Sequence, residues 1–201
     1  MSLKFANNNS LSAITALPAA VSGGSLNLIS TQTASSSSTI SFTSGIDSTY
    51  DEYVFKFINI HPATDNVTFQ FQADTGTNTN YNQTITSTVF RALHTEDASS
   101  ATLDYQTGID QAQGTGFQTL AGNIGNDNDQ NECGTLTLYQ PSSSTFVKHF
   151  LAEMNDSVYS DGLAHIFIAG YFNTTTALTR VQFKMSSGNI DSGTIKMYGV
   201  S

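Results

Sequence analysis

Apolar and polar residues alternate along much of this chain in short segments. In one of them Val67, Phe69 and Phe71 take every second position, and threonine or glutamine fills the positions between. Only an extended strand sends alternate residues to two opposite faces. The pattern therefore predicts β-strands that each turn one face toward a core.

The same pattern recurs at regular intervals, with polar turns between the segments. It predicts strands at 39–43, 52–60, 67–73, 83–95, 135–140, 145–154, 164–172, 178–185 and 193–200, and shorter patterns add 26–29, 102–105 and 117–120. No segment has a convincing helical period. The sequence thus predicts an all-β fold, a two-sheet antiparallel β-sandwich of jelly-roll-like type.

The segment 53–60 is apolar on both of its faces, apart from Lys56. This is typical of a central strand that is covered on both sides, or of a strand whose second face is covered by a neighbouring subunit. Clusters of Gly, Asn, Asp and Ser at 74–82, 125–131 and 186–192 predict turns, because these residues tolerate left-handed backbone.

The first 24 residues have a different character. They lack alternation and contain Pro18 and the pair Gly23-Gly24. We expect an extended N-terminal arm at 1–24 that precedes a β-sandwich domain at 25–201. The arm holds apolar residues that predict contact with another surface, namely Leu3, Phe5, Leu11, Ile14 and Leu17.

The composition indicates a neutral, polar surface around an aromatic core. Only 11% of the 201 residues are charged, against about 25% in ordinary soluble domains. Hydrophobic residues reach 38% and include 13 Phe and 8 Tyr, which is far from the composition of a disordered chain.

The net charge of −9 decides against several partners. The seven Lys and Arg residues form no basic stripe, so we expect no nucleic acid partner and no anionic membrane surface. No run of eighteen apolar residues predicts membrane insertion.

Residues 11–21 make a poor signal-peptide core, and the single Cys133 permits no intrachain disulfide. We therefore expect synthesis in a reducing cytoplasm without a cleaved signal.

One loop has part of a calcium-binding pattern. Residues 125–132 offer four oxygen-bearing side chains as candidates, Asp127, Asp129, Asn131 and Glu132. However, Glu132 stands where a calcium loop has its sharp-turn glycine, and no acid follows six residues later. A plain solvated turn is the alternative.

The sequence offers no set of catalytic residues. The four histidines lack metal-ligand partners at short spacing, and no serine lies in a nucleophile elbow. We expect neither an enzyme nor a transition-metal protein. Three tyrosines near turns, Tyr50, Tyr81 and Tyr159, stay free for recognition, although the usual sugar-stacking residue, Trp, is absent.

Most of the cations lie inside predicted strands rather than in turns. Lys56, Lys184 and Lys196 are each flanked by apolar residues, and Arg91 and Lys148 also fall on strands. One interpretation is that these are solvated positions that discourage edge-to-edge pairing. The other is that Lys56, Lys184 and Lys196 meet turn carboxylates of neighbouring copies and set the register of an interface.

Three strand-and-turn segments resemble a family of bacteriophage virion proteins. They are SFTSGIDSTYDEY at 41–53, YVFKF at 53–57 and GTIKMYGV at 193–200. The resemblance is to tail-fibre or capsid-decoration-like structural proteins of phages that infect marine bacteria and cyanobacteria, and it covers most of the chain beyond the arm. It implies a β-sandwich present in many copies on the virion exterior, and it carries no catalytic residue.

The expected function is therefore that of a non-enzymatic virion structural protein, in capsid decoration or in the neck or tail fibre. The expected partners are other virion proteins and further copies of the same chain. The alternative is a carbohydrate-binding adhesin that recognises a host surface glycan.

Overall fold

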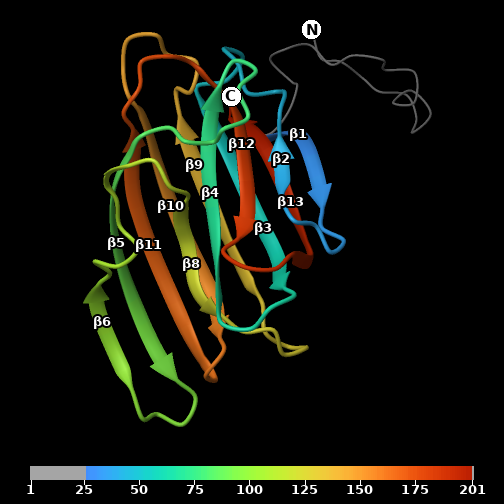
Figure 1. Cartoon of the computed structure of the whole chain (residues 1–201), viewed down its shortest axis with the longest axis vertical. Helices are drawn as coiled ribbons and strands as arrows, with labels where there is room; N and C mark the ends of the chain where they lie inside the picture. Colours follow the sequence, from blue (N-terminus) through green and yellow to red (C-terminus); the bar gives the residue numbers. More distant parts are fainter. Residues whose placement is uncertain (1–25, 201) are drawn as a thin grey trace, which may run out of the picture.

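A computed structural model describes residues 26–200, which form thirteen β-strands and no helix (Figure 1). The predicted arm at 1–24, with Leu3, Phe5, Leu11, Ile14 and Leu17, lies outside the described residues. In chain order the strands are β1 (Leu26–Thr33), β2 (Ile40–Phe42), β3 (Glu52–Pro62), β4 (Val67–Thr75), β5 (Ile85–Thr95), β6 (Ala101–Tyr105), β7 (Ala112–Gly114), β8 (Gln118–Ile124), β9 (Glu132–Tyr139), β10 (Lys148–Val158), β11 (Gly162–Phe172), β12 (Leu178–Met185) and β13 (Ile190–Val200).

All thirteen strands belong to one antiparallel sheet that is nearly closed into a barrel. Its large layer has the order β1-β13-β3-β9-β10-β11-β5, and β5 pairs in turn with β6 and β7. The small layer has the order β8-β4-β12-β2. The two layers join where β10 meets β8 through the register pair Val158 and Ile124. The prediction of an all-β antiparallel fold is confirmed.

Rings of phenylalanine fill the space between the layers. Phe183 of β12 lies with its ring centroid 5.2 Å from that of Phe57 and 5.4 Å from that of Phe55, both on β3. Phe71 of β4 meets Phe150 of β10 at 5.1 Å. All five side chains are buried, and each such burial contributes about 1.5–3 kcal/mol. These contacts hold the small layer against the large one.

Two buried polar groups fix connections between strands. The Asp74 carboxylate accepts hydrogen bonds from the amides of Thr75 (2.8 Å) and Tyr81 (2.9 Å) and from Gln83 Nε2 (3.1 Å). Asp74 therefore ends β4 and holds the following loop. The loop residue Tyr81 is buried by this arrangement, so the prediction that its ring is free for recognition is wrong.

A second polar cluster ties residues 106–117 to the layers. The buried Gln118 accepts a hydrogen bond from Ser87 Oγ (2.6 Å) and donates one to the Ile109 carbonyl (3.0 Å). The buried Gln72 donates from Nε2 to the carbonyls of Gln83 (3.0 Å) and Gly116 (2.9 Å). Because side-chain amides supply both donors and acceptors, this irregular segment needs few backbone ladder bonds of its own.

One cation is inside the molecule. Lys148 begins β10 with its side chain buried, and Nζ donates to the carbonyls of Phe146 (2.8 Å) and Thr174 (3.0 Å). Burial lowers the pKa of this amine. The expectation of a solvated position is therefore wrong for Lys148, because its alternation places it on the inward row of β10.

Strand β3 lies in the middle of the large layer, between β13 and β9, as a central strand should. Its inward residues Tyr53, Phe55 and Phe57 are buried, whereas on the other face Ile58 is 40% exposed. Within the single chain only one face of β3 is covered.

Residues 26–200 contain no helix of the length and apolarity that membrane crossing requires.

Candidate functional site

The candidate site is the outer face of the large layer, meaning the side of β1, β13, β3, β9, β10, β11, β5 and β6 that turns away from the core. The alternation of β10 and β11 is regular along their whole length, with every second residue buried over most of it. The sequence thereby separates an inner, packed set of side chains from an outer set. Antiparallel register then aligns the outer sets of neighbouring strands in rows across the sheet.

One row crosses the whole outer face, and we call it the aromatic row after its β6–β11 end. Its members face one another in register in the order Tyr105, Phe90, Phe167, Glu153, Thr135, Lys56, Lys196 and Thr31. The rings of Phe90 and Phe167 stack with centroids 5.0 Å apart and planes 16° apart. Aromatic cross-strand pairs of this kind stabilise a sheet, but here they also present rings to the solvent.

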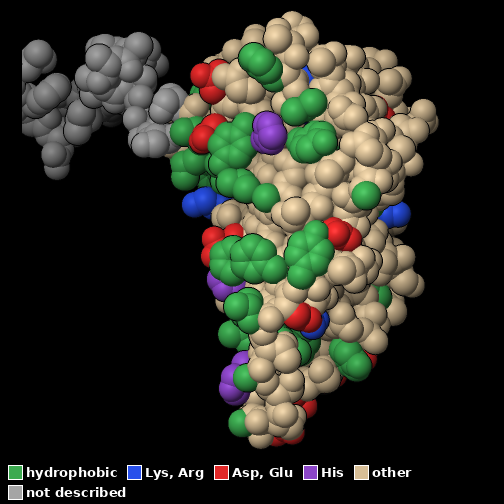
Figure 2. Space-filling model, turned by 90° about the vertical axis from the view of Figure 1, so that its left-hand side faces the viewer, with side chains coloured by type: hydrophobic (Ala, Val, Ile, Leu, Met, Phe, Trp, Pro, Cys, Tyr) green, Lys and Arg blue, Asp and Glu red, His purple; other side chains and the backbone are tan. Residues whose placement is uncertain are grey.

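Large hydrophobic side chains are exposed on this face. The exposed fraction is 45% for Phe90, 50% for Leu151, 51% for Leu163 and 76% for Leu103. Figure 2 views the molecule from the side on which β5, β6 and β11 lie in Figure 1, and shows hydrophobic side chains gathered in a band along its length. A scattered exposed Leu is ordinary, but a continuous apolar band indicates a surface that binds something.

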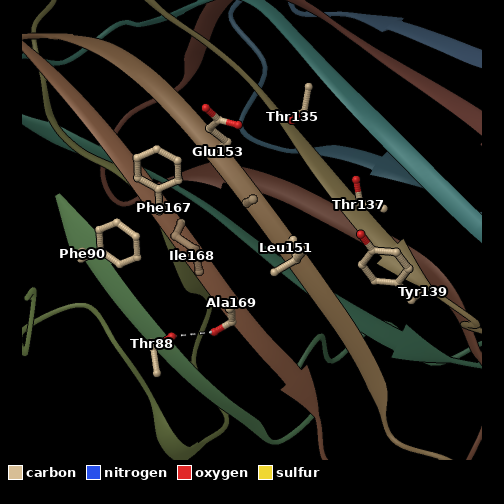
Figure 3. A pocket seen from close by; sticks show the side chains of 11 residues that line it. Thr88, Phe90, Thr135, Thr137, Tyr139, Leu151, Glu153, Phe167, Ile168 and Ala169 are labelled. Carbon is tan, nitrogen blue, oxygen red and sulfur yellow. Dashed lines mark hydrogen bonds between the residues drawn. The ribbon is translucent and has the colours of Figure 1, made fainter. Parts of the chain in front are cut away.

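The band is hollowed into a shallow groove of about 400 Å³ over β9, β10, β11 and β5. Figure 3 shows Phe90 and Phe167 on one side of it, Tyr139 on the other, and Leu151 between them. A second hollow of about 450 Å³ shares Tyr139 and Leu151 with the first and continues toward Tyr171. The groove thus crosses several strands instead of forming an enclosed pocket.

Polar groups lie in the groove and along the aromatic row beside it. Glu153 Oε1 lies 2.9 Å from Nε2 of His165, and His165 packs against the Phe167 ring at 4.3 Å. At the end of the aromatic row, the Tyr105 hydroxyl donates to Asp110 Oδ2 at 2.8 Å, and this hydrogen bond raises the pKa of the phenol. Burial raises the pKa of Tyr139 as well. Both phenols therefore stay neutral at physiological pH.

The structure places the three predicted interface lysines at two separate sites. Lys56 and Lys196 are directly opposite each other on the outer face, and Lys56 Nζ lies 5.7 Å from the centroid of the Tyr198 ring. Lys184 is on β12, with Nζ 4.4 Å from the centroid of the Phe117 ring. All three strands involved have a neighbour on each side. The edge-protection interpretation is therefore wrong for Lys56 and Lys196, which are paired on both sides, whereas Lys184 lies one residue beyond the part of β12 that pairs with β2.

The four candidate calcium ligands do not come together. Asp127, Asp129 and Asn131 lie in the connection between β8 and β9, whereas Glu132 is the first residue of β9 and its side chain is completely buried. Asp129 lines a small polar hollow of about 130 Å³ with acids from other loops. Within residues 26–200, no three His, Cys, Asp or Glu side chains are placed to hold a metal ion.

Two features of the structure were not predicted from the sequence. The first is the apolar band itself, because Phe90, Leu151 and Leu163 are assigned to a face only when the register is known. The second is a pair of buried acids, Glu132 and Asp156, whose residue types indicate turns. The available signal for Asp156 is its spacing, since it follows Met154 and precedes Val158 by two residues on the inward row of β10.

Comparison with family models, with curated proteins and with solved structures finds no match for this chain. What the protein does must therefore be inferred from the outer face, the groove and the sequence.

Proposed function

We propose that this protein is a non-enzymatic structural component of a bacteriophage virion, on the exterior of the particle in capsid decoration or in the neck or tail fibre. It acts through protein–protein contacts with further copies of itself and with other virion proteins. In this proposal the nearly closed sheet serves as the two layers of a jelly-roll-like sandwich, and the outer face of the large layer is the interface. The observation that carries the proposal is the set of exposed large hydrophobic side chains gathered along that face, Phe90, Leu103, Leu151 and Leu163.

The size of the outer face supports a stable interface. Eight strands at about 4.8 Å spacing and four rows at about 6.8 Å spacing cover roughly 1,000 Å². A specific, stable complex buries about 800 Å² on each partner. The face as a whole is therefore large enough for such a complex, and its exposed hydrophobic side chains favour association.

The charge distribution favours a protein partner over a nucleic acid or a membrane. The chain carries a net charge of −9, and the aromatic row has its only acid, Glu153, near its centre and its two cations near one end. Charges at the rim of an apolar patch fix register and specificity rather than affinity. Lys56 and Lys196 are placed to meet carboxylates of a neighbouring copy.

The proposal is tested by changing one exposed residue at the centre of the face. Leu151→Lys introduces a charge into the band, and the matched control Ser187→Lys introduces the same charge in the exposed turn between β12 and β13. Sedimentation velocity should show that the wild type and Ser187→Lys self-associate alike. Leu151→Lys should weaken association at least about tenfold, or about 1.4 kcal/mol. A wild-type protein that is monomeric at 100 µM and binds no capsid or tail would contradict the proposal.

The position on the particle is tested by counting copies. Quantitative mass spectrometry of purified virions should find hundreds of copies for a decoration protein, or about six to eighteen for a neck or fibre component, because these assemblies close with different symmetries. Absence of the chain from virions would refute the structural role.

A second candidate function is recognition of a host glycan. The observation that favours it is the groove, in which exposed rings alternate with hydroxyl groups of Thr88, Thr135 and Thr137 and with one acid, Glu153. Rings stack on sugars and hydroxyls fix their orientation. A glycan array would detect such binding, and Glu153→Gln should then reduce glycan binding while leaving association of the chain intact.

A further inference from the structure

Two acidic side chains lie side by side inside the molecule. Glu132 of β9 and Asp156 of β10 are register partners, and both point inward, with exposed fractions of 0% and 1%. Directly opposite residues of an antiparallel pair have Cβ atoms about 4.5–5.5 Å apart. Among the described residues, none of the four carboxylate oxygens has a hydrogen-bond partner.

The surroundings of the pair are apolar. Ile60 of β3 is the register partner of Glu132 on its other side, and Ala164 of β11 is that of Asp156. Met154 and Val158 precede and follow Asp156 on the inward row of β10. All four of these residues are buried, so the pair has no access to solvent in the closed structure.

Few charged or titratable groups act on the pair. Arg91 of β5 lowers the pKa of Asp156, but the guanidinium of Arg91 hydrogen-bonds to Asp104 of β6 at 3.3 Å, and the buried Arg91 Nε has no partner among the described residues. Cys133 of β9 acts on Glu132. The histidines of the adjoining strands have other partners: His165 Nε2 contacts Glu153 on the outer face, and His61 Nε2 contacts the Asp127 carbonyl.

Two negative charges on this buried pair are unfavourable in free energy. Taking one carboxylate out of water without hydrogen bonds is costly, and a second charge beside it adds repulsion. Burial raises the pKa of Asp156 to about 7, although Arg91 opposes the effect. Burial, the neighbouring Asp156 and then Cys133 raise the pKa of Glu132 well above its ordinary value. In slightly acidic solution both groups therefore carry protons in the folded protein.

The pair lies next to the seam that joins the two layers. Asp156 is followed by Ser157, whose carbonyl accepts from the Gly125 amide (3.3 Å) and whose amide donates to the Asn131 carbonyl (2.9 Å). The Tyr159 amide donates to the Asn123 carbonyl across the same seam (2.8 Å). The Gly125 and Tyr159 amides thus join β10 to the end of β8, beside the single register pair of the seam, whereas the Ser157 amide bonds to the segment that precedes β9. Solvation of an ionised Asp156 would require the seam to open.

We propose that Glu132 and Asp156 form an internal proton-binding site that keeps the seam between β10 and β8 closed when it is protonated and loosens it when it ionises. This inference goes beyond the structural role proposed above and does not depend on it. It makes the closure of the sheet sensitive to pH near neutrality.

The direction of the effect follows from the raised pKa values. In the unfolded chain both acids titrate near pH 4, whereas in the folded protein Asp156 holds its proton up to about pH 7. The folded state therefore binds more protons than the unfolded state between these values. The stabilisation is complete below about pH 4, is lost as the pH rises through about 7, and then stays low.

The test follows thermal unfolding of the full chain between pH 5 and pH 8.5. The wild-type Tm should fall by about 5–10 °C from pH 5 to pH 8, because a chain of this size loses about 2–4 °C for each kcal/mol of stability. Asp156→Asn and Glu132→Gln remove one charge each and should flatten this dependence. The control Asp191→Asn replaces an exposed carboxylate of β13 and should keep the wild-type pH dependence.

A second measurement uses only the wild-type protein, because a buried amide variant can fail to fold. Hydrogen exchange of the Gly125 and Tyr159 amides, which donate across the seam, should accelerate at least about tenfold from pH 6 to pH 8.5 after correction for the intrinsic effect of pH, while core amides of β3 stay protected. A flat Tm profile, or uniform exchange across the sheet, would overturn the proposal. So would a rise in Tm with millimolar Ca²⁺ or Mg²⁺ at pH 8 that Asp156→Asn abolishes, since the pair would then be a metal site.

Discussion

At the scale of single residues, the ring of Phe183 has the most connected position in the core. Its ring contacts those of Phe42, Phe55 and Phe57 edge to face and stacks with Phe69 at 5.8 Å. Because these rings come from both layers, removal of the Phe183 ring would leave a cavity between the layers, and rings on both sides would lose a contact. Packing of this density leaves little freedom to fill such a cavity.

We predict that Phe183→Ala lowers the free energy of unfolding by about 3–5 kcal/mol. Urea denaturation measures the loss, and Phe183→Leu provides a milder variant if the alanine variant does not fold. Phe90→Ala is the matched control, because Phe90 is 45% exposed, and we expect it to cost less than about 1.5 kcal/mol. An equal loss in both variants would show that the core does not depend on Phe183.

The sequence predicted the burial of some residues and not of others. The hydrophobic members of the core follow from alternation, since Phe55, Phe69 and Phe183 are inward in the strands expected for them. The buried Asp156 did not follow, because its neighbours Asn155 and Ser157 make the run resemble a turn. The predicted strand at 145–154 accordingly ends too early, whereas β10 runs to Val158. At Asp156, residue type outweighed spacing in the prediction, although the side chain is buried.

At the scale of elements, strand existence was predictable where the alternation is long. Twelve of the thirteen observed strands overlap a predicted one, and β12 has the predicted bounds 178–185. The exception is β7, which has three residues and contains Gln113 in left-handed conformation at φ 57°. So short an element has no period to detect. Its position is set by polar side chains of other strands.

That dependence gives a prediction for the segment 106–117. In Gln118→Leu the Ser87 hydroxyl loses its acceptor and the Ile109 carbonyl loses its donor, which should cost about 1–3 kcal/mol. We expect the Gln111 amide, which donates to Ser87 Oγ at 2.9 Å, to exchange with solvent faster than in the wild type. Gln32→Leu on the exposed edge strand β1 should leave this exchange unchanged.

A second element-scale prediction concerns the loop after β4. Replacing Asp74 with Ala removes a carboxylate that accepts three hydrogen bonds, so the Thr75 amide, the buried Tyr81 amide and Gln83 Nε2 lose their acceptor. We expect a loss of about 2–3 kcal/mol and faster proteolysis between β4 and β5. If the loop stays as resistant as in the wild type, its conformation is held by the burial of Tyr81 instead.

At the scale of the whole molecule, the sequence predicted an all-β antiparallel fold but not the order in which its strands pair. Register decides which residues share the outer face, and it depends on pairings between distant segments such as β5 with β11 and β3 with β13. Bulges complicate it further: β3 and β13 shift register twice, near Asn59 and Gly193, both of which have positive φ. Alternation within one strand carries no information on such pairings. The sequence alone therefore could not predict that the hydrophobic residues of the apolar band lie together on one face.

The last prediction concerns the relation between assembly and folding. The described fold begins at Leu26, in the edge strand β1, and residues 1–24 hold five large apolar side chains but lack strand alternation. Among the described residues, the buried hydrophobic core runs from Ala34 to Met197. Deleting residues 1–24 should therefore change the Tm by only a few degrees.

The same deletion should sharply weaken association or incorporation into particles. Each large apolar side chain of the arm contributes about 1.5–3 kcal/mol when it is buried on a neighbouring copy, less the cost of ordering the segment. Combining the deletion with Leu151→Lys separates two cases. If the arm docks on the outer face of a neighbour, the double variant associates no more weakly than the weaker single variant, because both changes remove one contact. If the two losses add, the arm binds elsewhere, and a truncated protein that unfolds outright would make residues 1–24 part of the fold.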